Sequence, residues 1–217
     1  MSERGRAAVH DEPAVDLGAP RGACVGGYAG AGEGLRRMHA LLLEAGGLVA
    51  SLLSGASGAG DLAGAQDPAG ATGSRSSRAA LIAAAGPRAQ GLREEYELLV
   101  EVIYEGYLLH YCSPRVVIAP EQDLALLAGD QLYAVGLARL VALGDTVAVA
   151  ELADTITLSA LAQAAGEREL ADAVWEAGAR AVGWGPSEGH RRAKELLHRG
   201  SPEALDAMRT SAEVKAR

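Results

Sequence analysis

Hydrophobic residues recur at helical spacing along most of the second half of the chain. Between residues 92 and 111 they fall three or four positions apart, while glutamates gather on the opposite side. This spacing places apolar groups along one face of a helix. Similar patterns predict further helices at 122–143, 145–165, 168–182, 188–198 and 202–214. The chain is therefore expected to form an all-α, antiparallel helical bundle.

Particular residues define the expected core and the helix ends. Gly129 and Gly136 would let a neighbouring helix approach the 122–143 helix closely. Asp145 is expected to cap the next helix, because its carboxylate can accept bonds from unpaired amides of the first turn. Ser201 is expected to cap the last helix, with Pro202 at its first position. The expected core of the first helix comprises Leu92, Tyr96, Leu99, Val100, Ile103 and Tyr107.

The first third of the chain has a different composition. Residues 1–77 are rich in Gly, Ala, Ser, Asp and Pro, and such sequences bury too little apolar surface to repay the entropy lost on ordering. A largely disordered arm is predicted there, followed by a helical domain over 78–217. Within the arm, 35–53 has apolar residues at helical spacing and is predicted to fold against the body or a partner, although Gly46 and Gly47 weaken this helix.

Charge and cysteine content narrow the expected surroundings of the protein. The formal net charge of −8 disfavours nucleic acid, whose phosphates would be repelled. The two cysteines, Cys24 and Cys112, are too few for a disulfide framework, and they favour a reducing compartment. The most apolar run, residues 40–53, is shorter than the ~20 residues that a bilayer requires. A cytoplasmic protein without a membrane span is expected.

Two sequence segments in the helical region resemble the trans-isoprenyl diphosphate synthase family. Residues 102–110 read Val-Ile-Tyr-Glu-Gly-Tyr-Leu-Leu-His, similar to the family helix that precedes the first aspartate-rich motif. Residues 126–132 read Leu-Leu-Ala-Gly-Asp-Gln-Leu, and Leu143-Gly144-Asp145 follows, similar to the next family helix. The resemblance covers about a third of the chain. It implies part of the isoprenoid synthase fold, an antiparallel bundle around a central cavity.

The family's catalytic aspartates do not appear in this sequence. The family uses them to hold magnesium ions that grip an allylic diphosphate. Here Tyr111-Cys112-Ser113 follows His110, and the connection to Asp130 is shortened. Arg115 is the remaining candidate for a diphosphate contact that the resemblance suggests. No catalytic or metal-ligating residues are therefore predicted, and magnesium is expected only if the protein is a divergent enzyme.

Other polar residues are candidate sites with structural alternatives. Asp130 and His110 join Arg115 as candidate substrate contacts, although a structural role is favoured for Asp130. The basic cluster Arg191, Arg192 and Lys194 is a candidate contact for an anion or an acidic partner, with a solvated surface favoured. The acidic stripe at 97, 101 and 105 is predicted to be a solvated helix face. His110 with Cys112 makes a poor zinc site, because further ligands are missing.

Three functions remain open at this point. The favoured one is a non-catalytic subunit that pairs with an active prenyl diphosphate synthase, or with itself, and regulates it. The second is a divergent enzyme acting on isoprenoid diphosphates. The third is a general helical adaptor with no role in isoprenoid synthesis.

Overall fold

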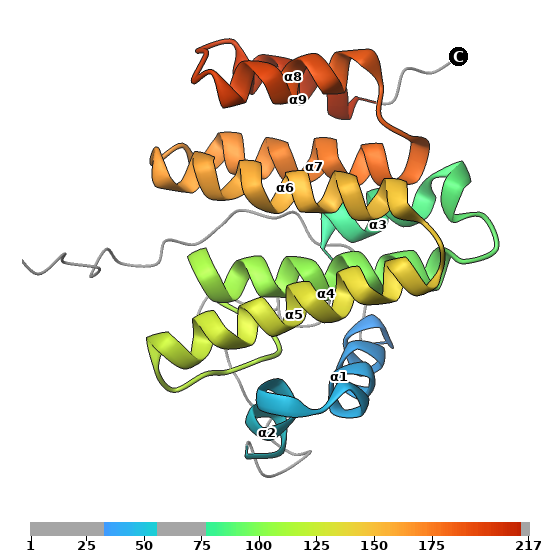
Figure 1. Ribbon diagram of the computed structural model, residues 1–217, viewed down its shortest axis with the longest axis vertical. Helices are drawn as coiled ribbons and strands as arrows, with labels where there is room; N and C mark the ends of the chain where they lie inside the picture. Colours follow the sequence, from blue (N-terminus) through green and yellow to red (C-terminus); the bar gives the residue numbers. More distant parts are fainter. Residues whose placement is uncertain (1–32, 56–76, 214–217) are drawn as a thin grey trace, which may run out of the picture.

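The computed structural model of the chain describes residues 33–55 and 77–213, and within them all regular secondary structure is helical. Figure 1 shows α5 and α6 on the viewed side, with α4 and α7 behind them. The pair α1–α2 lies at one end of the molecule and α8–α9 at the other. The elements are α1 (Glu33–Ala45), α2 (Gly47–Gly55), α3 (Arg78–Ala85), the short 3-10 helix η2 (Pro87–Ala89), α4 (Arg93–Tyr111), α5 (Gln122–Ala142), α6 (Thr146–Ala164), α7 (Arg168–Trp184), α8 (Glu188–His198) and α9 (Ala204–Ala212).

The all-α class expected from the sequence is confirmed in the described residues, but two features differ from the prediction. Helix α3 was not predicted, because its Ala-rich sequence has no clear apolar period. The expected 35–53 helix is two helices, broken where Gly46 adopts a positive φ of 71°. These helices pack on α4 and α5, so they belong to the folded body. Most of the predicted disordered arm, 1–32 and 56–76, lies outside the described residues.

Helices α4 and α5 pack closely because small residues line their contact. A Cβ atom on Gly136 would lie 2.4 Å from Cγ1 of Ile103, and one on Gly129 would lie 2.4 Å from the ring of His110. Only glycine fits at such distances. The predicted close approach to the 122–143 helix is therefore confirmed, and the resemblance-based pairing of these two helices is compatible with it.

Helices α3 and α7 meet main chain to main chain. A Cβ atom on Gly86, just after α3, would lie 2.1 Å from the carbonyl oxygen of Gly183. A Cβ atom on Gly183 would lie 2.6 Å from the carbonyl oxygen of Ala83. This crossing places η2 beside the C-terminal end of α7, where Nε of Arg88 donates a hydrogen bond to the carbonyl oxygen of Val182 at 3.1 Å.

The helix ends follow the predicted capping with one exception. Asp145 caps α6 by accepting a hydrogen bond from the Ala148 amide at 3.0 Å. It also pairs with Arg88 at 2.5 Å and accepts a hydrogen bond from the Tyr96 hydroxyl, which ties η2 and α4 to α6. At the last helix, Ser201 is not the cap, because α9 begins at Ala204, after a turn that contains Pro202.

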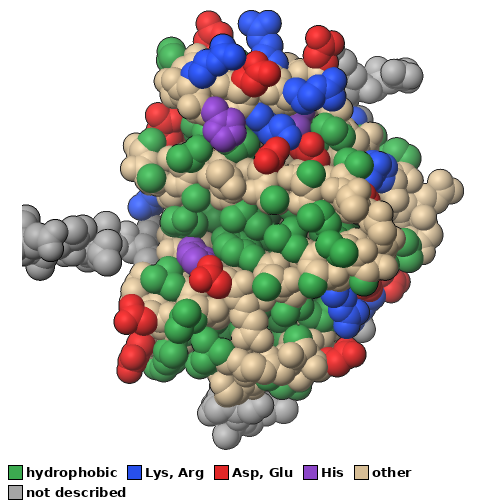
Figure 2. Space-filling view, viewed as in Figure 1, with side chains coloured by type: hydrophobic (Ala, Val, Ile, Leu, Met, Phe, Trp, Pro, Cys, Tyr) green, Lys and Arg blue, Asp and Glu red, His purple; other side chains and the backbone are tan. Residues whose placement is uncertain are grey.

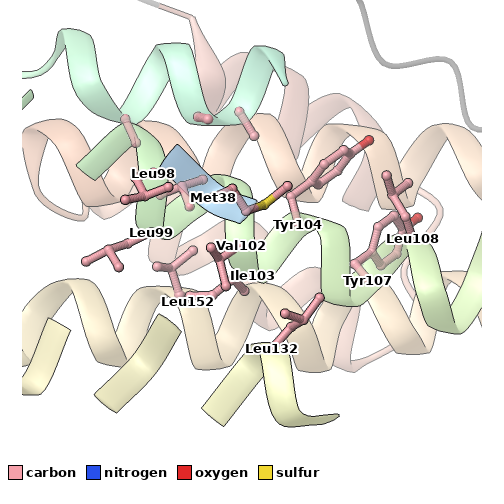
Figure 3. Packing of buried hydrophobic residues seen from close by; sticks show 14 of the residues in the cluster. Met38, Leu98, Leu99, Val102, Ile103, Tyr104, Tyr107, Leu108, Leu132 and Leu152 are labelled. Carbon is pink, nitrogen blue, oxygen red and sulfur yellow. The ribbon is translucent and has the colours of Figure 1, made fainter. Parts of the chain in front are cut away.

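Side chains fill the interior between α4, α5 and α6, where the resemblance implies a cavity. Figure 3 shows Met38 of α1 reaching the side chains of α4, with Leu132 of α5 and Leu152 of α6 nearby. Leu92, predicted to be buried, is 46% exposed because it precedes the first turn of α4. The side chains with no exposed surface in this cluster include Met38, Leu99, Val100, Ile103, Tyr107, Leu132, Leu140 and Leu152.

By length and composition alone, α5 and α6 could each cross a bilayer. Apolar helices of this length also occur in the cores of soluble proteins, and both helices here pack on neighbouring helices. Each carries a carboxylate that pairs with a basic side chain from another helix, Asp130 in α5 and Glu151 in α6. Length and composition alone do not decide between these two settings, so the absence of a membrane span stays a prediction.

Candidate functional site

The acidic stripe on α4 turns inward, so the prediction of a solvated face is wrong for two of its three glutamates. Glu101 is 1% exposed and Glu105 is fully buried. Charged groups are rarely buried unless they are paired and hydrogen-bonded. The partners come from outside the helix, chiefly from Arg115 in the connection between α4 and α5.

Arg115 bridges the two carboxylates. Its Nη2 lies 2.6 Å from Oε1 of Glu101, and its Nε lies 3.2 Å from Oε2 of Glu105. The guanidinium carbon also lies 5.3 Å from the ring centre of Tyr104. Arg115 is thus committed to the protein interior, and its predicted role as a diphosphate contact is not supported.

Glu105 also holds the main chain of the α4–α5 connection. Its Oε1 accepts hydrogen bonds from the amides of Arg115 and Val116, both at 2.6 Å, and from the amide of Val117 at 3.3 Å. Successive amides that point at one carboxylate form an anion-binding concavity. Here the anion is the protein's own side chain, so the concavity is already filled.

Glu101 fastens the start of the helical domain. Its Oε2 accepts hydrogen bonds from the amide and the hydroxyl of Ser77, at 2.8 and 2.7 Å. Ser77 in turn caps α3. Burial raises the pKa of Glu101, while Arg115 and Ser77 oppose that shift. The two glutamates therefore join α3, α4 and the α4–α5 connection into one unit, which we call the Arg115 lock (Glu101, Glu105 and Arg115).

Magnesium does not fit the Arg115 lock. Magnesium needs oxygen ligands in near-octahedral placement, whereas these carboxylate oxygens already accept backbone amides, Ser77 and a guanidinium. Across residues 33–55 and 77–213, no group of three or more His, Cys, Asp or Glu side chains is placed to hold a metal ion. The connection that follows α4 thus serves as a structural clamp.

His110 and Asp130 meet across the α4–α5 contact, as two of the predicted candidates. Nε2 of His110 lies 3.2 Å from Oδ1 of Asp130, and its ring stacks on Tyr133 with centres 5.3 Å apart. Burial lowers the pKa of His110, with Asp130 opposing. Asp130 is 68% exposed at its side chain, so it does not line an interior cavity. The pair therefore links α4 to α5 near the protein surface.

Cys112 cannot serve as a metal ligand. It is buried and disulfide-bonded. The other cysteine of the chain, Cys24, lies outside the described residues. The expectation of reduced cysteines is therefore wrong for Cys112, while the predicted compartment stays a prediction.

The predicted basic cluster on α8 divides into two parts. Arg191 and Arg192 lie at the exposed surface. Lys194 instead pairs with Glu151 at 3.0 Å and with Asp154 at 2.7 Å, both on α6. Only the two arginines therefore remain candidates for contact with an acidic partner.

A second polar cluster, around Glu151, was not predicted from the sequence. His190 is buried, and its Nε2 lies 3.1 Å from Oε2 of Glu151. Its Nδ1 lies 3.4 Å from the hydroxyl of Ser211 on α9. Burial raises the pKa of Glu151, but hydrogen bonds from His190 and Lys194 outweigh it, and the pKa is lowered. The spacing of Glu151 with Asp154, and of His190 with Lys194, places each pair on one helix face and was the available signal.

The order Ser211, His190, Glu151 superficially matches the nucleophile, base and acid of a hydrolase. The Ser211 hydroxyl, however, donates to the Met208 carbonyl within its own helix at 2.9 Å. Glu151 is shared with Lys194, which holds it in place as an ion-pair partner. The cluster joins α6, α8 and α9, and we assign it a structural role.

The hollow beside the N-terminal end of α4 is open to solvent. Arg37 and residues 91–95 line it. It contains none of the predicted site residues.

Comparisons with protein-family models, with curated proteins and with solved structures give no match for this chain.

Proposed function

We propose that the chain is a non-catalytic helical subunit, similar to isoprenyl diphosphate synthases in its α4–α5 region, that pairs with an active prenyl synthase and regulates it. The observation that carries the proposal is an uncovered apolar surface on α5. The part of the proposal that names a prenyl synthase rests on the resemblance of residues 102–110 and 126–145.

The uncovered surface on α5, which we call the α5 face, consists of Leu127, Ala134, Ala138 and Val141. Leu127 and Val141 are each 57% exposed, and Ala134 and Ala138 between them are exposed as well. Leu127, Ala134 and Val141 are seven residues apart, so they lie along one line of the helix. Figure 2 shows hydrophobic side chains gathered across the middle of the side that α5 and α6 form. Asp130 lies between Leu127 and Ala134 along the helix, whereas Ala134, Ala138 and Val141 follow one another at helical spacing. Large exposed apolar patches mark interaction sites.

The Arg115 lock supports the non-catalytic part of the proposal. In the family, carboxylates near the end of this helix would hold magnesium against a diphosphate. Here the nearest interior carboxylates, Glu101 and Glu105, are bound by Arg115 and by amides of the connection. Releasing them would break a buried ion pair, which typically costs about 3–5 kcal/mol. Contact and shape are therefore the means of action that we propose.

The pairing can be tested by co-purification. The full chain would be expressed with a panel of catalytic prenyl diphosphate synthases, and we expect one of them to co-elute and to change its product length. A double variant, Leu127→Glu with Val141→Glu, should abolish co-elution because it places charges on the α5 face. Leu43→Glu, at another exposed leucine (42%), is the matched control. Co-elution with no synthase, or co-elution that survives the double variant, would contradict the proposal.

The enzyme alternative is tested with the purified chain. Incubation with allylic diphosphates of several lengths, isopentenyl diphosphate and magnesium should give no product. Magnesium-dependent turnover of these diphosphates by the purified chain would instead assign catalysis to this chain.

A further inference from the structure

The outward side of α6 carries a stripe with a regular pattern of its own. Its members are exposed and lie alternately three and four residues apart. This is the spacing of the contact positions in a coiled coil. We call it the α6 stripe: Val147, Ala150, Asp154, Thr157, Leu161 and Ala164.

The α6 stripe is self-complementary when it is reversed. If a second α6 runs antiparallel with its centre between residues 155 and 156, Val147 faces Ala164 and Ala150 faces Leu161. Each larger side chain then meets an alanine, which lets two helices approach closely. Leu161 is 45% exposed and Val147 39% exposed in the single chain, so both have surface to bury.

The single charge on the stripe does not oppose this pairing. In the reversed register Asp154 faces Thr157, so the two copies of Asp154 do not meet head-on. Asp154 also pairs with Lys194 of its own chain at 2.7 Å, which offsets its negative charge. Charge pattern and size pattern thus select the same register.

By composition, residues 1–32 and 56–76 are poorly suited to cover this surface. Residues 56–76 contain one large aliphatic residue, Leu62, and residues 1–32 have no sustained run of large apolar residues at helical spacing. By contrast, a second α6 would bring its own two large aliphatic residues and four further stripe positions. The self-complementary register is what favours a second copy over an unrelated helix.

We propose that a second copy of this chain docks along the α6 stripe, antiparallel and related by a two-fold axis that passes between Asp154 and Thr157. Such an interface is isologous, because the same surface serves both copies. The proposal concerns a different surface from the α5 face. It therefore stands or falls independently of the pairing with a prenyl synthase.

The oligomeric state of the full chain gives the first test. Sedimentation equilibrium should show a dimer, and Leu161→Glu should weaken it about tenfold or more, since every 1.4 kcal/mol changes a dissociation constant tenfold. Leu127→Glu, which alters the α5 face, should leave the dimer intact. Circular dichroism of both variants checks that the fold is kept. A monomer at all concentrations would overturn the proposal, including a monomer that floats with phosphatidylcholine vesicles, which would assign the stripe to lipid.

Cysteine cross-linking tests the register. The double variant Ala150→Cys with Leu161→Cys should form a disulfide-linked dimer on mild oxidation, because each new cysteine faces the other in the second copy. Within one chain the two positions are eleven residues apart on one helix, ~16 Å at 1.5 Å per residue, and cannot bond. The single variants should remain uncross-linked. Efficient cross-linking of Ala150→Cys alone would indicate a parallel arrangement and would refute the proposed register.

Discussion

At the scale of single residues, the buried carboxylate of Glu105 shows how a charge in the interior is supplied with hydrogen-bond and ion-pair partners. Its oxygens accept three main-chain amides and one guanidinium contact. Removing one partner of a buried pair leaves the other charge without compensation. The energetic importance of Glu105 should therefore far exceed that of the surface glutamates.

Glu105→Ala should lower the free energy of unfolding by about 3–5 kcal/mol, because Arg115 and the amides of residues 115–117 lose their acceptor. Urea unfolding followed by circular dichroism measures this change. Glu195→Ala is the control, since Glu195 is 66% exposed in an ion pair with Arg199, and its removal should cost no more than about 0.5 kcal/mol. Equal losses in the two variants would contradict the role assigned to the Arg115 lock.

Asp172 on α7 should make stability depend on pH. Burial, with the nearby charges of Glu176 and Glu169, raises the pKa of Asp172 from 3.8 to about 6. Because the folded state holds the proton more tightly than the unfolded state, stability contributed by Asp172 is present below pH 3.8 and is lost as the pH rises through 6. Asp172→Asn should thus raise the melting temperature at pH 7.5.

The gain in melting temperature from Asp172→Asn should shrink as the pH falls and vanish near pH 3.5. At that pH the side chain at position 172 is neutral in the folded state of both the original protein and the variant. Thermal unfolding at several pH values measures it. Asp206→Asn, at an exposed aspartate on α9, serves as the control. A gain that stays constant from pH 3.5 to 7.5 would rule out the titration as its cause.

At the scale of helices, the apolar period predicted well which segments form long helices. It predicted less well the short helix that depends on packing against its neighbours. The 188–198 helix was predicted with the bounds of α8, and the helices near 122 and 168 were predicted within two residues at either end. Helix α3 was missed because Ala-rich Arg78–Ala85 is defined by packing on α4 and α7. Tertiary contacts decide such segments, and they cannot be read from local spacing.

The candidate site was harder to predict than the helices. A glutamate stripe on a helix is usually solvated, and nothing local indicates that Arg115, beyond Pro114, folds back to meet Glu101 and Glu105. The Glu151 cluster likewise joins residues about forty positions apart. Both arrangements depend on long-range contacts. The meeting of His110 with Asp130, by contrast, follows from pairing the two helices that the sequence singled out.

The α4–α5 contact yields a prediction about glycine. Gly136→Ala should lower stability by about 1–3 kcal/mol, because the new Cβ would lie 2.4 Å from the buried side chain of Ile103. Gly189→Ala on α8 is the matched control, since its nearest neighbour would be Ser187 Oγ at 3.8 Å. That variant should gain up to about 1 kcal/mol from helix propensity. A stabilising Gly136→Ala would show that the two helices can separate freely.

At the scale of the whole molecule, α1 and α2 extend the folded body beyond the predicted domain. Met38 of α1 is fully buried, and Gln131 of α5 accepts a hydrogen bond from the amide of Val49 at 3.0 Å. The helices also connect to the body through Arg37 with Glu94 and Arg139 with Glu44. Residues 33–55 should therefore unfold together with the rest of the bundle.

Met38→Ala should lower the free energy of unfolding by about 2–5 kcal/mol, the usual cost of truncating a buried large side chain. Leu43→Ala on the same helix is the control, since Leu43 is 42% exposed and should change stability by no more than about 0.5 kcal/mol. Denaturant unfolding with one transition is expected for both. An unaffected Met38→Ala would show that α1 is not integral to the core.

The crossing of α3 and α7 restricts which amino acids related sequences can have at two positions. A Cβ atom on Gly86 would lie 2.1 Å from the carbonyl oxygen of Gly183, and a Cβ atom on Gly183 would lie 2.6 Å from the carbonyl oxygen of Ala83. No exchange of neighbouring side chains can make room, because the obstacle is common to every amino acid. Homologues that keep this crossing must retain glycine at both positions, even where the remainder of α3 has diverged.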